Sequence, residues 1–220
     1  VILMLFKYLS KKKEEKPETG GIKNIIFDVG QVLVDYDWET YLDSFGFEPA
    51  KRERIAKATF QSPVWDERDR GLYEEDVYLK QFQELDPEDA EDIEKVIRGT
   101  GGTIHKRPYA DTWVKYLKSK GYHVYILSNY SSYMLDHTKK ELTFRREMDG
   151  EVFSCYANQL KPDAEIYQTI LNKYQLKPEE CVFIDDRPEN CRGAQEQGIH
   201  TICFKDFKQV TADLEKLGVK

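Results

Sequence analysis

Short, nearly continuous apolar runs, each followed by polar residues, limit the folds open to this chain. The runs are rich in β-branched and aromatic residues and lie at 25–27, 124–127, 181–184 and 201–204. Such runs are typical of strands buried on both faces of a sheet. Apolar stripes with helical spacing lie between them, at 113–117 and at 166–174. Strands that alternate with helices predict an α/β fold with a mostly parallel sheet.

The stretch from Trp38 to about Arg107 breaks this rhythm. It has apolar residues at helical spacing, many charges and no convincing buried strand, and 99–102 indicates a hinge or loop. We therefore predict a three-layer, Rossmann-like core with helices on both faces, formed by 22–36 and 108–220, and a small helical cap at 37–107 inserted after the first strand. The charged segment 65–72 of this cap is interpreted as a solvated face, with contact of Asp69 or Arg70 with substrate as the alternative.

The N-terminal segment 1–21 is predicted to be a mobile tail or a short amphipathic helix. Its apolar stretch covers only 1–6, which is too short to span a bilayer. The basic run 11–13 follows this stretch, whereas a secretory signal places positive charge before it. We expect no stable membrane insertion, with weak contact of a membrane surface as the less favoured alternative.

The charge balance and the cysteines exclude some classes of protein. Acidic residues number 40 against 33 basic ones, a formal net charge of −7, and there is no basic stripe of the kind that nucleic acids require. The four cysteines form no CxxC pair, which argues against a zinc site or a disulfide framework and favours a reducing compartment. We expect a cytoplasmic protein, a monomer or weak homodimer, that binds a small molecule and no nucleic acid.

Polar groups stand where the predicted strands end or the next loops begin. They are Asp28, Ser128, Asn129, Lys161, Asp185 and Asp186. Because the carboxyl ends of parallel strands meet at one edge of a sheet, these groups can converge on one crevice. Taken singly, Asp185 and Asp186 could cap the next helix, and Lys161 could be an ordinary surface lysine.

Phosphoryl transfer needs a set of groups of this kind. Carboxylates suit Mg²⁺, which prefers oxygen ligands, while a hydroxyl, backbone amides and an ammonium can neutralise phosphate oxygens. An ionised aspartate beside the cation can attack phosphorus and form an aspartyl-phosphate. The set therefore indicates a Mg²⁺-dependent reaction of a phosphoester.

Four segments resemble, in order, the motifs of haloacid dehalogenase-type hydrolases. They are 27–33, 126–129, Lys161-Pro162 with Ile166-Tyr167 behind it, and 182–190. The resemblance covers the core from about Ile22 to the C-terminus, and the insert lies where the helical cap of that family enters. Each segment alone is a weak signal, but four in this order on these elements are a strong one.

The resemblance implies a role for each of these residues. Asp28 would be the nucleophile and a metal ligand, and Gly30 would offer its carbonyl to Mg²⁺. Ser128 and Asn129 would bind the transferring phosphate. Lys161 would neutralise the charge of nucleophile and phosphate, and the metal shell would be completed by Asp185 and Asp186, one of them through water.

Gly30 departs from the pattern of the family's phosphatases, which usually carry a second aspartate at this position as general acid/base. Glycine transfers no proton, so another donor, a water chain or a substrate with a good leaving group is needed. The sequence most resembles a bacterial Asp-x-Gly subgroup, some members of which act on sugar phosphates such as glucose 1-phosphate.

Two other functions compete with a phosphatase that acts on a small metabolite. The first is a metal-independent 2-haloacid dehalogenase, against which the acidic pair Asp185-Asp186 argues, because unneutralised carboxylates would repel the nucleophile. The second is a catalytically weak binding or regulatory protein of the same fold, which Gly30 keeps open.

Overall fold

The computed structural model describes residues 21–220, so the predicted tail, except for Gly21, lies outside the described residues. A five-stranded sheet in the order β5-β4-β1-β6-β7 forms the centre, and all neighbouring strands are parallel. The strands are β1 (Asn24–Phe27), β4 (His123–Ser128), β5 (Gly150–Phe153), β6 (Cys181–Asp185) and β7 (His200–Cys203). This sheet confirms the predicted α/β class.

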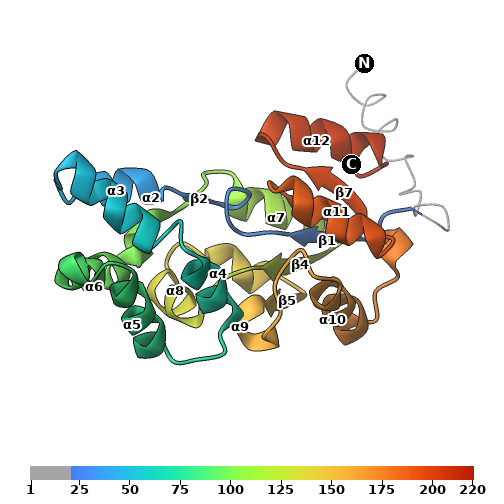
Figure 1. The fold of residues 1–220 in the computed structure, drawn as a ribbon. Coiled ribbons are helices and arrows are strands. Elements are labelled where there is room, and N and C mark those ends of the chain that lie inside the picture. Colours follow the sequence, from blue (N-terminus) through green and yellow to red (C-terminus); the bar gives the residue numbers. More distant parts are fainter. Residues whose placement is uncertain (1–20) are drawn as a thin grey trace, which may run out of the picture.

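Both faces of the sheet are covered, which is why its strands read as continuous apolar runs. Along β1, Ile25 and Phe27 face one cluster and Ile26 faces the other. The first cluster includes apolar side chains of α7 (Ala110–Ser119) and α12 (Phe207–Lys216), and the second includes those of α10 (Ala164–Tyr174) and α11 (Pro188–Glu196). The result is the predicted three-layer core, seen nearly edge-on in Figure 1.

One strand of the sheet escaped prediction. β5 lies at the edge beside β4, and only Val152 and Phe153 in it are buried apolar residues. An edge strand is paired on one side only, so a short apolar stretch suffices for it and gives little signal in the sequence.

The helical cap follows the first strand, as predicted. It contains α2 (Trp38–Asp43), α3 (Pro49–Ala58), α4 (Pro63–Arg70), α5 (Glu75–Leu85) and α6 (Ala90–Arg98), with a 3-10 turn at Pro87–Asp89. These helices share a hydrophobic cluster of their own, which includes Leu42, Phe82 and Ile97. In Figure 1 the cap lies to one side of the sheet, with α4 nearest to the strands.

A small antiparallel ribbon connects the cap to the core. The chain leaves the core through β2 (Val34–Tyr36) and returns through β3 (Ile104–Lys106), which pair with each other. Among the described residues of the insert, β3 is a short strand with a single buried residue, in keeping with the expectation of no buried strand there, and the glycine-rich segment before it forms a 3-10 helix at Thr100–Thr103. We propose that the core consists of 22–36 and 108–220 and the cap of 37–107, as predicted. The two strands of this ribbon lie where the chain enters the cap and where it leaves the cap.

The remaining elements surround the carboxyl edge of the sheet. They are the short helices α8 (Ser132–His137) and α9 (Ser154–Ala157) and two 3-10 helices at Thr143–Glu147 and Pro178–Glu180. Within residues 21–220, no helix has the length and apolar character needed to cross a membrane.

Candidate active site

Asp28 lies directly after the central strand β1. Its backbone N–H donates to the carbonyl of Ile184 on β6 over 2.9 Å, which continues the sheet and fixes the backbone. The side chain is 7 % exposed. Its Oδ1 accepts hydrogen bonds from the hydroxyl of Ser128, at the end of β4, over 2.6 Å and from the backbone N–H of Val29 over 2.8 Å.

Lys161 reaches the same carboxylate from the loop before α10. Its ammonium lies 2.9 Å from Oδ1 of Asp28 and 2.6 Å from Oδ2 of Asp185, and the residue is 4 % exposed. The side chain of Asn129 holds the lysine backbone at both polar groups, accepting from its N–H over 2.9 Å and donating to its carbonyl over 3.1 Å. Lys161 is therefore no surface lysine.

Asp185 is the last residue of β6 and Asp186 is the next residue, and both lie near Asp28. Asp185 is fully buried, and its carboxylate also accepts from the Arg187 backbone N–H over 2.8 Å and from the Asn190 side chain. Asp28, Asp185 and Asp186 each offer an oxygen, and these oxygens lie within 4.8 Å of one another. Three hard oxygen ligands so close together fit Mg²⁺ well.

The electrostatics of this cluster favour a bound cation. Burial raises the pKa of Asp28 to about 6; Lys161 opposes the rise and Asp185 adds to it. Burial, and then Asp185, raises the pKa of Asp186. Burial would lower the pKa of Lys161, but the carboxylates of Asp185 and Asp28 outweigh it and the pKa is raised. One ammonium faces three carboxylates, and a divalent cation would remove the remaining repulsion.

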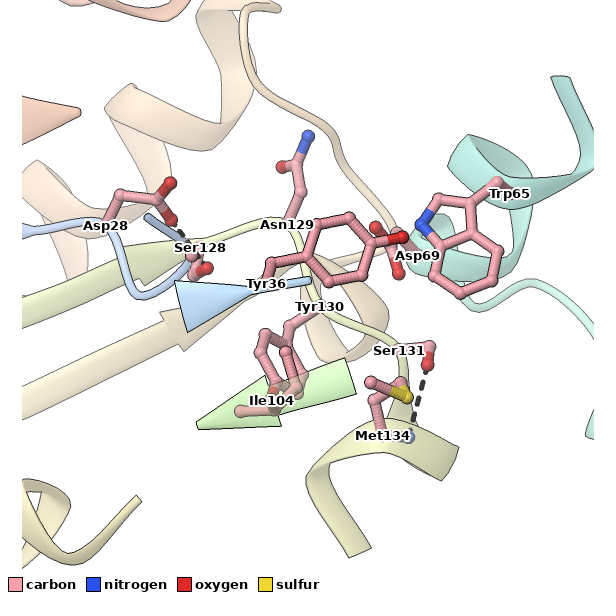
Figure 2. Close-up of a pocket in the computed structure, with 11 residues that line it drawn as sticks. Asp28, Tyr36, Trp65, Asp69, Ile104, Ser128, Asn129, Tyr130, Ser131 and Met134 are labelled. Atoms are coloured by element: carbon pink, nitrogen blue, oxygen red, sulfur yellow. Dashed lines mark hydrogen bonds between the residues drawn. The ribbon is translucent and has the colours of Figure 1, made fainter. Parts of the chain in front are cut away.

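A cavity of about 100 Å³ opens beside Asp28. Its lining combines core and cap residues: Asp28, Gly30, Tyr36, Trp65, Asp69, Ile104, Ser128, Asn129, Tyr130, Ser131 and Met134. Figure 2 shows Asp28 and Ser128 at one side of this group and Asp69 and Trp65 of α4 at the other. The structure thus brings every predicted site residue to one region. Lys161 contacts Asp28, oxygens of Asp185 and Asp186 lie within 4.8 Å of an oxygen of Asp28, and Gly30, Ser128 and Asn129 line the cavity.

The interpretation of 65–72 as a solvated face was wrong for part of this segment. Arg68 is 1 % exposed, and Trp65 and Asp69 line the cavity. The spacing gave a usable signal, because Trp65 and Asp69 are one helical turn apart on one face. The exposed Asp66 and Glu67 point elsewhere and make the segment look polar as a whole.

The fold and the site together define a class: capped α/β hydrolases with an aspartate at the carboxyl end of the central strand. A model of the haloacid dehalogenase-like hydrolases matches residues 22–198. The chain belongs to this family.

Known proteins similar over most of the chain include phosphatases. The chloroplast flavin mononucleotide hydrolase 1 of Arabidopsis thaliana is 25 % identical over 195 residues, covering 89 % of this chain and 77 % of the relative. The D-ribitol-5-phosphate phosphatase of Bacteroides thetaiotaomicron is 26 % identical over 191 residues, covering 82 % and 90 %.

Solved structures share the fold. A family enzyme from Bacteroides thetaiotaomicron in complex with magnesium and inorganic phosphate superimposes with a TM-score of 0.68 at 23 % identity, covering 86 % of this chain and 99 % of that chain. This likeness extends over core and cap.

Proposed function

We propose that this hydrolase is a Mg²⁺-dependent phosphatase that acts on a small phosphorylated metabolite through an aspartyl-phosphate on Asp28. The observation that carries the proposal is the cluster of Asp28, Asp185 and Asp186, whose oxygens lie within 4.8 Å of one another beside the buried Lys161. Phosphoryl transfer requires a nucleophile, a cation site and a positive charge in one place. Phosphatases among the relatives support the same conclusion.

The three carboxylates would bind Mg²⁺ in different ways. Asp185 already accepts hydrogen bonds from Lys161, the Arg187 backbone and Asn190, so it orients its neighbours and would hold the ion through water. Asp28 and Asp186 would be direct ligands, and the carbonyl of Gly30 a further one. When bound, the ion would neutralise the phosphate oxygens.

The contacts of Asp28 leave one of its oxygens for the reaction. Val29, Ser128 and Lys161 all contact Oδ1. Oδ2 would attack phosphorus in line, the bond from phosphorus to the leaving oxygen would break, and that oxygen would take up a proton. Water would then attack the phosphorus of the aspartyl-phosphate, releasing orthophosphate and restoring the carboxylate. Lys161, Ser128 and Asn129 would stabilise the charge on nucleophile and phosphate.

The cavity favours a compact, uncharged leaving group that carries hydroxyls. Its volume is about 100 Å³, and among the described residues that line it there is no lysine or arginine to pair with a second anionic group. Tyr36, Trp65 and Tyr130 offer aromatic surfaces with polar tips. We propose sugar or polyol monophosphates, including glucose 1-phosphate, as the substrate class.

The test uses the full chain and a panel of sugar, polyol and nucleotide monophosphates together with 4-nitrophenyl phosphate. We expect turnover that needs Mg²⁺ and is abolished by chelator, with sugar or polyol phosphates ahead of nucleotides. Asp28→Asn should lower turnover at least about 10³-fold, because an amide is a poor nucleophile. Asp43→Asn, which changes an exposed aspartate of the cap, is the matched control.

Two results would contradict this proposal. Hydrolysis of 2-haloacids that persists in chelator would indicate the dehalogenase. A folded protein that binds phosphoesters but shows no Mg²⁺-stimulated turnover on any of them would indicate a binding or regulatory protein.

A further inference from the structure

Gly30 stands at the position where phosphatases of this family usually carry an aspartate as general acid/base, so this chain has no proton donor there. A Cβ added to Gly30 would meet no atom within 4 Å, and Gly30 lines the same cavity as Asp28. The neighbouring Gln31 does not replace the acid: its side chain donates to the carbonyl of Tyr36 over 2.9 Å and accepts from Arg107 over 3.2 Å. An amide also has no proton to transfer at neutral pH. The proton must therefore come from elsewhere in the cavity.

The cap supplies a carboxylate to this cavity. Asp28 and Asp69 are the two carboxylates among the described residues that line it, and Asp69 comes from the last turn of α4. In Figure 2 the two lie at opposite sides of the lining, with the ring of Tyr36 and the side chain of Asn129 between them. An in-line attack from Asp28 drives the leaving oxygen away from the nucleophile. That direction leads toward the cap and Asp69.

The backbone of Asp69 is firmly placed. The hydroxyl of Ser154 donates to its carbonyl over 2.5 Å, and the side chain of Asn158 donates to the carbonyls of Arg70 and Gly71, each over 3.1 Å. These contacts attach the end of α4 to the core around α9. A catalytic group needs this kind of support, because small displacements cost large factors in rate.

The surroundings of Asp69 suit a group that both donates and accepts a proton. Burial raises its pKa to about 7; Arg68 and a backbone hydrogen bond from Ser131 oppose the rise, while Asp66 and Asp28 add to it. Tyr36 and Tyr130 also face it, and burial raises the pKa of both phenols, so they stay neutral. A carboxyl that titrates near neutrality is well matched to general acid/base work.

We propose that Asp69 of the cap is the general acid/base of this enzyme, in place of the side chain that Gly30 lacks. The inference rests on the proposed phosphatase function. As Oδ2 of Asp28 bonds to phosphorus, the electron pair of the breaking P–O bond passes to the leaving oxygen, which takes the proton of Asp69. The resulting carboxylate then accepts a proton from the water that attacks the aspartyl-phosphate. Orthophosphate leaves, and both aspartates return to their starting states.

The assignment predicts a dependence on the leaving group. An alkoxide from a sugar or polyol phosphate needs a proton as it departs, whereas 4-nitrophenolate is a stable anion and needs none. Asp69→Asn should therefore slow single-turnover cleavage of a sugar phosphate by about 10²–10⁴-fold, the usual contribution of general acid catalysis. Cleavage of 4-nitrophenyl phosphate in the same assay should slow by less than about fivefold. With this substrate in excess, the variant should release a burst of one nitrophenolate per enzyme, because the second step has lost its base.

Glu67→Gln is the matched control, because it removes the same charge from an exposed side chain of the same helix that pairs with Arg70. It should change neither rate by more than about twofold. In the wild-type enzyme, single-turnover cleavage of the sugar phosphate should fall as pH rises through about 7, and this limb should be absent in Asp69→Asn. Asp69→Ser also lacks a titratable group, so it should show the same difference between the two substrates and the same loss of the pH limb.

The possible results separate this inference from the proposed function. Loss of sugar phosphate cleavage with retained cleavage of the aryl phosphate supports Asp69 as the acid. Equal slowing of both substrates, or of neither, overturns it while the phosphatase stands. If the wild-type enzyme cleaves neither substrate with Mg²⁺, the phosphatase function falls and this inference falls with it.

Discussion

At the scale of a single residue, the raised pKa of Asp69 suits acid/base chemistry near neutral pH but lowers the stability of the folded protein there. The pKa rises from 3.8 to about 7, chiefly because the partial burial of Asp69 disfavours the charged form, with smaller contributions from the charges of Asp66 and Asp28. A carboxyl with a raised pKa stabilises the folded state below its unfolded pKa, and this stability is lost as pH rises through the folded value. The loss therefore falls between about pH 4 and pH 7.

This linkage predicts how Asp69→Asn changes the pH dependence of stability. The free energy of unfolding of the wild-type protein should fall between pH 5 and pH 8 by about 2 kcal/mol more than that of the variant, because asparagine does not ionise. Urea unfolding at both pH values, in chelator, measures the difference. Glu67→Gln, on the exposed side of the same helix, should retain the wild-type fall. Parallel pH profiles for wild type and Asp69→Asn would mean that Asp69 ionises freely in the folded protein.

Single residues also differ in how far their placement could be predicted. Asp28, Ser128 and Asp185 could be placed because each ends a buried strand, and strand ends converge in a parallel sheet. Asp69 could not be placed in this way. Its spacing from Trp65 predicts only that the two share one face of α4; where that face points depends on how α4 packs between the cap cluster and α9.

At the scale of elements, the contact between α4 and α9 decides where the cap carboxylate stands. Gly71 ends α4 with φ +72°, and a Cβ there would lie 2.7 Å from the carbonyl oxygen of Cys155 in α9 and 2.8 Å from its Cα. Gly46 after α2 has nearly the same backbone, φ +68°, but a Cβ there would meet nothing within 4 Å. A side chain at either position would strain the backbone, but only at Gly71 would it also clash with α9.

Replacing each glycine by alanine should give different results. Gly46→Ala should cost about 1 kcal/mol, the strain of a left-handed residue, and leave sugar phosphate turnover unchanged. Gly71→Ala should cost about 2–4 kcal/mol, since it adds a clash with backbone atoms, and should lower kcat about tenfold or more by moving α4. Urea unfolding and steady-state kinetics provide both numbers. Equal effects of the two variants would show that the contact with α9 does not position the cap.

Elements with strong periodic patterns were predictable, and those with little burial were not. The central strands and α7 and α10 carry long apolar patterns that their packing on two faces requires. β3 and β5 have few buried residues each, and their existence depends on pairing with a neighbour rather than on their own composition.

At the scale of the whole molecule, the cluster of Asp28, Asp185 and Asp186 joins distant parts of the chain. Asp28 follows β1, whereas Asp185 ends β6 and Asp186 comes directly after it, so their oxygens meet only in the folded protein. A ligand that binds only the folded state stabilises it by mass action, by about 2.7 kcal/mol at a concentration 100 times its Kd. Mg²⁺ should therefore raise the free energy of unfolding by this route.

Asp186→Asn should reverse the order of stability between chelator and Mg²⁺. In chelator the variant should be more stable than the wild-type protein, because one of three crowded carboxylates has lost its charge. In saturating Mg²⁺ the wild-type protein should be the more stable, because the variant has lost a charged ligand and gains little from the ion. Urea unfolding at pH 8 with chelator or with Mg²⁺, at equal ionic strength, tests the reversal, and NaCl alone controls for screening. An increase with Mg²⁺ that is the same in both proteins would place the ion elsewhere on the surface and remove the cation from the mechanism.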